Sequence, residues 1–86
     1  MNKVIIDVRE PLEFMTGHVK GALNNPPAKL LAGAKKLQDV PKDAEIILYC
    51  RTGSRSAVAA NILQSLGYTN LTNGINKDHV NARFLN

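Results

Sequence analysis

The sequence predicts an α/β fold, a three-layer sandwich in which helices cover both faces of a mostly parallel sheet of about five short strands. Apolar runs that suit buried strands alternate with helical patterns about every ten to fifteen residues, the spacing of parallel-sheet units. One run, residues 46–49, is apolar without interruption, as in a strand covered on both faces. The 86 residues contain no repeat and no low-complexity tract, so we expect a single domain over residues 1–86.

The first half of the chain predicts two short strands and two helices. Residues 4–6 are β-branched and suit a buried strand that ends in a charged turn. Pro11 suits the first position of a helix of one or two turns. Residues 22–24 predict a second strand. From residue 28 to 37 the apolar side chains fall on one helical face, which predicts a continuous helix that Gly33 weakens.

The second half repeats the alternation. The expected elements are a strand over 46–49, a helix over 56–66, a strand over 69–72 and a short helix around Val80. Asn73-Gly74 predicts a turn after the last strand. Ligands of parallel sheets bind beyond the carboxyl ends of the strands, so we expect Asp7-Val8-Arg9, Asn24-Asn25 and Cys50 to converge there.

Composition excludes several classes of function. One Cys rules out an internal disulfide and a Cys-rich metal site, and the two His are too far apart to suggest a ligand pair. The net charge of +4 comes from scattered lysines with few aromatics, which does not favour nucleic acid. No run approaches the ~20 apolar residues of a membrane span. We expect a cytoplasmic monomer, or a periplasmic one if a leader has been removed, with no metal or other cofactor.

Cys50 lies at the most informative position of the chain. It ends the apolar run and precedes a short loop and a helix N-terminus, where unpaired N–H groups and the helix dipole favour an anion. Arg51 and Arg55 add positive charge. Each effect favours the thiolate, which is the reactive form of cysteine. The segment therefore predicts a nucleophilic, anion-binding cysteine loop.

Four segments in order give the chain a resemblance to a known family, the rhodanese (thiosulfate sulfurtransferase) homology domain, and to its small single-domain, phage-shock-like members. They are residues 6–10 (IDVRE), 13–24 (EFMTGHVKGALN), 49–56 (YCRTGSRS) and 66–68 (LGY). The resemblance covers nearly the whole chain. Two positions depart from the family pattern: Asn73-Gly74 stands where Gly-Gly is common, and Asn25 stands where an apolar residue is common.

The resemblance implies that Cys50 takes sulfur from thiosulfate as a persulfide and passes it to cyanide, a small thiol or a partner protein. The loop amides from Arg51 to Ser56 would then cradle the anion, with Gly53 allowing the curl. Thr52 would contribute through this backbone cradle. The hydroxyl groups of Ser54 and Ser56 would add hydrogen bonds, and Ser56 could also be the helix N-cap. We expect one of Arg51 and Arg55 to reach the anion and the other to be held by Asp7 or another acid. Asp7 is expected to be structural support, and Arg9 to lie at the rim of the site.

Other functions remain open at this point. A cysteine phosphatase or arsenate reductase would need a wider loop, with five residues between Cys and Arg, whereas four separate Cys50 from Arg55. A non-enzymatic binding module would be expected to lack the Cys. A persulfide carrier in a protein sulfur relay would use the same Cys50 loop, so the sequence does not separate it from a thiosulfate enzyme.

Overall fold

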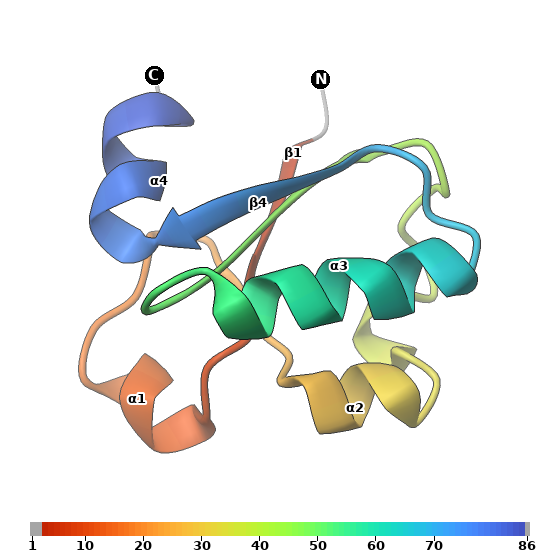
Figure 1. The fold of residues 1–86 in the computed structure, drawn as a ribbon, viewed down its shortest axis with the longest axis horizontal. Coiled ribbons are helices and arrows are strands. Elements are labelled where there is room, and N and C mark those ends of the chain that lie inside the picture. Colours follow the sequence, from red (N-terminus) through yellow and green to blue (C-terminus); the bar gives the residue numbers. More distant parts are fainter. Residues whose placement is uncertain (1–2, 86) are drawn as a thin grey trace.

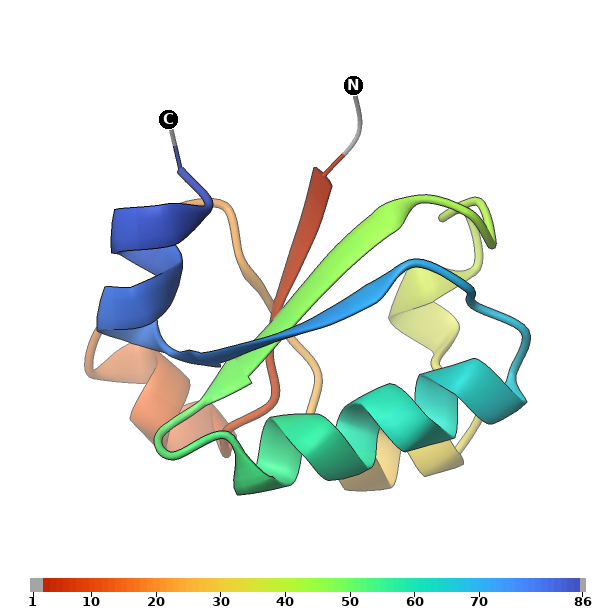
Figure 2. The same cartoon turned by 45° about the horizontal axis from the view of Figure 1, so that its top comes forward.

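Four parallel strands form the sheet in the order β2-β1-β3-β4. Figures 1 and 2 show how the helices are arranged around this sheet. The computed structural model describes residues 3–85. The strands are β1 (Lys3–Asp7), β2 (Leu23–Asn24), β3 (Glu45–Cys50) and β4 (Leu71–Asn76). The predicted α/β class and parallel sheet are confirmed, but the described residues form four strands rather than about five.

Helices cover both faces of this sheet, as the uninterrupted apolar run of β3 predicts. Leu48 and Cys50 face one core cluster, which includes residues of α2 (Pro27–Leu31), the 3-10 helix η1 (Lys35–Leu37) and α3 (Ser54–Ser65). Ile47 and Tyr49 face the opposite cluster, which α4 (Lys77–Arg83) and Phe14 of α1 (Pro11–Met15) cover (Figure 2). All four of these β3 side chains are buried, because alternate residues of a strand point to opposite faces. None of the helices within residues 3–85 is long and apolar enough to cross a membrane.

The predicted continuous helix over residues 28–37 is wrong. Helix α2 ends at Leu31, and the chain then passes through two residues with positive φ, Gly33 at 117° and Ala34 at 52°. A left-handed conformation costs roughly 1–2 kcal/mol for a residue other than glycine. The burial of Ala34 and Leu37 in the core offsets that cost, because the break turns η1 onto the sheet.

The predicted turn at Asn73-Gly74 is also wrong, because β4 continues through both residues to Asn76. The pairing of β3 with β4 shifts register here: Leu48 pairs with Asn73 and Tyr49 with Ile75, so Gly74 is an extra, bulged residue. A Cβ on Gly74 would lie 2.6 Å from Cγ2 of Val80. The glycine therefore permits close packing of α4, and the short helix predicted around Val80 is confirmed, with Val80 fully buried.

The carboxyl ends of the strands meet along one edge of the sheet. Asp7 pairs with Asn24 on one side and with Tyr49 on the other, and Cys50 pairs with Asn76. The expected convergence is confirmed. This edge carries the candidate active site.

Candidate active site

Cys50 ends β3 and lies at the floor of a cleft of about 360 Å³. Only 2% of the surface of Cys50 is exposed to solvent. The cleft walls come from the segment after β1, the end of α1 and the start of α4. A reagent that fits this cleft therefore approaches the thiol from one side.

The loop after Cys50 holds the sulfur as an anion. The backbone N–H of Gly53 donates a hydrogen bond to Cys50 Sγ over 3.1 Å. Burial by itself would raise the pKa of this thiol, but hydrogen bonds from the Ser56 hydroxyl and from the N–H groups of Ser56, Thr52 and Gly53 outweigh it. Together they lower the pKa of Cys50 from 9.0 to about 7. At neutral pH about half of the cysteine is thiolate.

Gly53 makes the curl of this loop possible. Its φ of 95° lies in the left-handed region that favours glycine, and it occupies the N-cap position of α3. The helix begins at Ser54, two residues earlier than predicted. The expectation that Ser56 is the N-cap is therefore wrong, since Ser56 lies in the first turn and its side chain points back into the loop.

Ser56 and Asn73 connect the loop to β4. The Ser56 hydroxyl lies 2.6 Å from Asn73 Oδ1, 3.1 Å from the Gly53 carbonyl and 3.6 Å from Cys50 Sγ. The amide nitrogen of Asn73 also donates to the Gly53 carbonyl over 2.9 Å. Asn73, which stands where the family commonly has glycine, thus braces the cysteine loop against the neighbouring strand.

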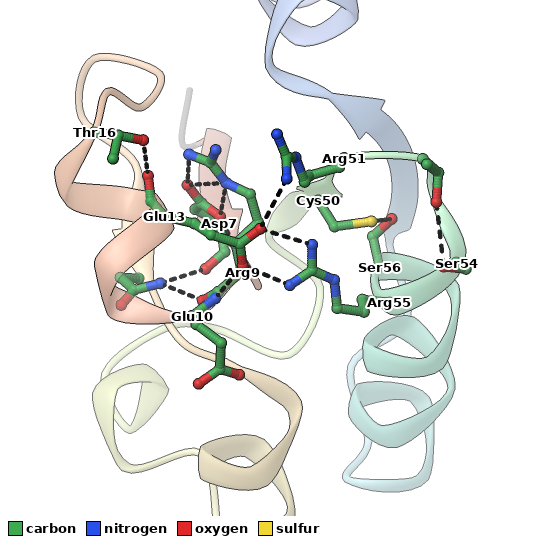
Figure 3. Close-up of polar contacts among 12 residues, drawn as sticks. Asp7, Arg9, Glu10, Glu13, Thr16, Cys50, Arg51, Ser54, Arg55 and Ser56 are labelled. Atoms are coloured by element: carbon green, nitrogen blue, oxygen red, sulfur yellow. Dashed lines mark hydrogen bonds and ion pairs between the residues drawn. The ribbon is translucent and has the colours of Figure 1, made fainter.

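The two loop arginines converge on one carboxylate, that of Glu13 in α1 (Figure 3). Arg55 donates to both oxygens of Glu13, at 2.7 Å and 3.1 Å. The more exposed Arg51 lies 3.9 Å from the same group. Hydrogen bonding from Arg55, followed by that from the Glu10 N–H, lowers the pKa of Glu13 from 4.5 to about 2. The acid that holds a loop arginine is therefore Glu13 and not Asp7.

Asp7 instead binds Arg9 and Tyr49 in the core. Figure 3 shows the contact between Asp7 and Arg9. The carboxylate is fully buried and accepts the Arg9 side chain at both oxygens. It also accepts the Tyr49 hydroxyl over 2.8 Å. Burial above all raises the pKa of Tyr49 to about 12, which keeps this donor protonated. Arg9 lines the cleft as expected for a rim residue, but its guanidinium is bound by Asp7 and by the Gly17 carbonyl.

The hydroxyl groups of Thr52 and Ser54 do not bond to the sulfur. Thr52 and Ser54 are exposed, and their hydroxyl groups lie 3.3 Å from each other (Ser54 in Figure 3). The sequence prediction missed Glu13, Asn73 and Lys77, of which the last lines the cleft beside Cys50. No local pattern marks them, because each meets the loop only after the chain folds. Within residues 3–85 no group of three or more His, Cys, Asp or Glu side chains is placed to hold a metal ion.

The chain also resembles known proteins in its sequence and in its fold. The family model described as the rhodanese-like domain matches residues 1–78. The chain belongs to the rhodanese-like domain family. Among solved structures, a rhodanese from Escherichia coli determined with anions superimposes with a TM-score of 0.80 and 29% identity, and 91% of each chain is covered.

Two curated members of the rhodanese family illustrate the sequence similarity. The thiosulfate sulfurtransferase PspE of Escherichia coli is 36% identical over 69 residues, which cover 79% of this chain and 64% of PspE. The thiosulfate:glutathione sulfurtransferase of Saccharomyces cerevisiae is 34% identical over 79 residues, which cover 80% of this chain and 57% of that protein. The chain thus spans between half and two thirds of the length of these relatives.

Proposed function

We propose that this chain is a sulfurtransferase that moves the outer sulfur of thiosulfate through a persulfide on Cys50 to an external acceptor. The environment of Cys50 carries the proposal. Cys50 lines a cleft, and its Sγ accepts a hydrogen bond from the Gly53 N–H over 3.1 Å. The pKa of the Cys50 thiol is lowered to about 7. A nucleophile needs such a site, in which the anionic form is populated at neutral pH and fixed donors surround it.

In the first step the Cys50 thiolate attacks the outer sulfur of thiosulfate. A bond forms between Sγ and that sulfur, the S–S bond of thiosulfate breaks, and sulfite leaves with the electron pair. The product is Cys50–S–S⁻, so the three negative charges of the reactants are conserved. We infer that the loop N–H groups that stabilise the thiolate also stabilise the terminal sulfur of the persulfide.

In the second step an acceptor attacks the outer sulfur of the persulfide and releases the Cys50 thiolate. This chain has one Cys, so no second thiol within it can displace the sulfur. The acceptor must therefore be external, and cyanide, a small thiol or a protein thiol all have the required nucleophilic atom. The names of PspE and the Saccharomyces cerevisiae protein support thiosulfate as donor, and the latter name supports a thiol as acceptor.

A protein acceptor, and hence a role as persulfide carrier, is supported by the surface of α1. Leu12 and Met15 are 77% and 76% exposed, and Leu12 lies beside Glu13 and Arg51 at a second hollow next to the loop. Leu12 and Met15 are three residues apart, so they lie on one face of the helix, and contiguous exposed apolar surface is a feature of docking sites. A carrier would keep the same Cys50 chemistry and differ only in its acceptor.

Phosphatase and arsenate reductase chemistry has less support. Four residues rather than five separate Cys50 from Arg55, and Arg55 is engaged by both oxygens of Glu13. A guanidinium whose charge is already matched by a carboxylate attracts a tetrahedral oxyanion less strongly than an unpaired one. The loop presents backbone N–H groups to a sulfur atom instead.

The test is thiocyanate formation from thiosulfate and cyanide, with aryl phosphate hydrolysis measured beside it. We expect the wild-type chain to form thiocyanate, and Cys50→Ala and Cys50→Ser to form none above background. Phosphate release from the aryl ester with no thiocyanate formation would overturn the proposal. A Cys50→Ala variant that keeps substantial activity would overturn the covalent mechanism.

A further inference from the structure

Several basic side chains lie in or beside the cleft above Cys50, but most of them are already paired with a carboxylate. Arg9 lines the cleft, but its charge is matched by Asp7 at 2.6 Å. Arg55 is matched in the same way by Glu13 at 2.7 Å. Arg51, with 72% of its side chain exposed, has the same Glu13 carboxylate at 3.9 Å. The three arginines thus face two carboxylates, which compensate Arg9 and Arg55 and leave the exposed Arg51 with a distant, shared partner.

Lys77 differs from these arginines. It lines the same cleft, is half-buried, and among residues 3–85 has no carboxylate within 4.0 Å of its ammonium group. Asp78, the acidic side chain among the described cleft residues, is exposed and does not pair with it. A cation without a partner, held at the wall of a cleft, attracts an anion more strongly than one already paired.

The backbone fixes where the side chain of Lys77 begins. Lys77 follows Asn76, the residue of β4 that pairs with Cys50, so the sheet holds the Lys77 backbone next to the end of β3. Its Nζ lies 3.4 Å from the position that a Cβ on Gly17 would take, on the opposite wall of the cleft. The Gly17 carbonyl in turn accepts Nη2 of Arg9 at 2.8 Å. Lys77 therefore extends across the cleft towards the backbone of Gly17, close to the path to Cys50.

We infer that Lys77 is a specificity-determining residue that selects reagents carrying an anionic group beside their reactive atom, and that it binds the oxyanion end of the sulfur donor. The second part of this inference, the binding of the sulfur donor, rests on the proposed function. Attack of a thiolate on thiosulfate brings a negative charge towards a dianion, and a nearby cation offsets the repulsion. A reagent without charge gains nothing from the same cation, so Lys77 should favour anionic reagents over neutral ones.

Two alkylating reagents of nearly equal size test the first part without any assumption about the reaction. Iodoacetate is anionic and iodoacetamide is neutral, and both react with the Cys50 thiolate. The ratio of their rate constants reports the electrostatics of the cleft, because any change in the pKa of Cys50 affects both rates equally. We expect Lys77→Gln to lower the iodoacetate-to-iodoacetamide ratio by roughly threefold to tenfold, less than for a buried charge-assisted hydrogen bond because solvent screens a half-exposed charge.

Two control variants make the test specific. Lys77→Arg keeps the charge and should keep the ratio near that of the wild type. Lys35→Gln removes the same charge from an exposed site on η1, which packs on the other face of the sheet from α4, and should leave the ratio unchanged. The effect of Lys77→Gln should shrink as salt is added, because ions screen exposed charges. A ratio in Lys77→Gln equal to that of the wild type, or a loss of equal size in Lys35→Gln, would overturn the inference.

Thiosulfate loading, followed as persulfide formation by mass in single-turnover experiments, tests the second part. We expect Lys77→Gln to load roughly tenfold more slowly than the wild type, while alkylation of Cys50 by neutral iodoacetamide, compared at equal thiolate fraction, keeps its rate. If the wild type does not load at all, the proposed function fails, and the alkylation ratio still decides the role of Lys77. If loading is normal in Lys77→Gln while the ratio falls, Lys77 does not bind the donor.

Discussion

Replacing Ser56 by alanine tests how the loop sets the reactivity of Cys50. A hydrogen bond to a charged group contributes about 1.5–3 kcal/mol, which corresponds to about one to two pKa units. The Ser56 hydroxyl has a single proton, and it lies 3.6 Å from Cys50 Sγ but 2.6 Å from Asn73 Oδ1. Because the thiolate shares this proton with Asn73, we expect a rise of about one unit, from about 7 to about 8.

The assay is the rate of alkylation of Cys50 by iodoacetamide as a function of pH. In Ser56→Ala the midpoint should move up by about one unit, and the rate at pH 7 should fall about fivefold because less thiolate is present. Ser54→Ala is the matched control, since Ser54 lies in the same helical turn but its exposed hydroxyl is directed to Thr52. Thermal unfolding identifies variants that have lost their fold.

Two results would refute this reasoning. An unchanged midpoint in Ser56→Ala would mean that the hydroxyl does not reach the sulfur. A midpoint that returns to the ordinary value of 9.0 would mean that the N–H groups of Gly53 and its neighbours only offset the effect of burial, and that the hydroxyl alone accounts for the net lowering of the pKa.

Two further predictions concern stability. Gly74→Ala should lower the free energy of unfolding by about 1–3 kcal/mol in urea titrations, because the new Cβ would lie 2.6 Å from Val80 and 2.9 Å from Ile47; an unchanged midpoint would contradict the packing of the bulge. Glu13→Gln should remove a pH-dependent part of the stability. The pKa of Glu13 is lowered from 4.5 to about 2, so its contribution is present above about pH 4.5 and is lost as the pH falls towards 2. Since a quarter of the side chain is exposed (26%), we expect about 1 kcal/mol, seen as a smaller loss of stability on acidification in the variant than in the wild type.

The order of strands and helices was predictable because it depends on short-range patterns. The apolar run of β3, the proline that starts α1 and the glycine-containing loop before α3 are each visible within a few residues. The family resemblance rests on the same segments, and they carry the fold. Where the prediction failed, a distant contact decided the local structure: Ala34 adopts a positive φ to bring η1 onto the core, and Gly74 stays in β4 because α4 packs against it.

The candidate site was predictable in part for the same reason. The position of Cys50 between a strand and a helix follows from neighbouring residues. The ion pair of Glu13 with Arg55 joins residues 42 positions apart, and the bond between Ser56 and Asn73 joins residues 17 apart. We expected Asp7 or another acid to hold a loop arginine. The Asp7 carboxylate instead binds Arg9, which lies only two residues away in the chain.

The most direct test of the central claim is the intact mass of the wild-type chain before and after incubation with thiosulfate. If Cys50 carries sulfur, the mass of the chain should rise by about 32 Da. Dithiothreitol should remove this added mass, and Cys50→Ala should not show it. Reversal by dithiothreitol also separates a persulfide from a sulfinic acid of nearly the same mass, which thiols do not reduce. A folded wild-type chain whose Cys50 reacts with iodoacetamide but gains no mass from thiosulfate would contradict the account.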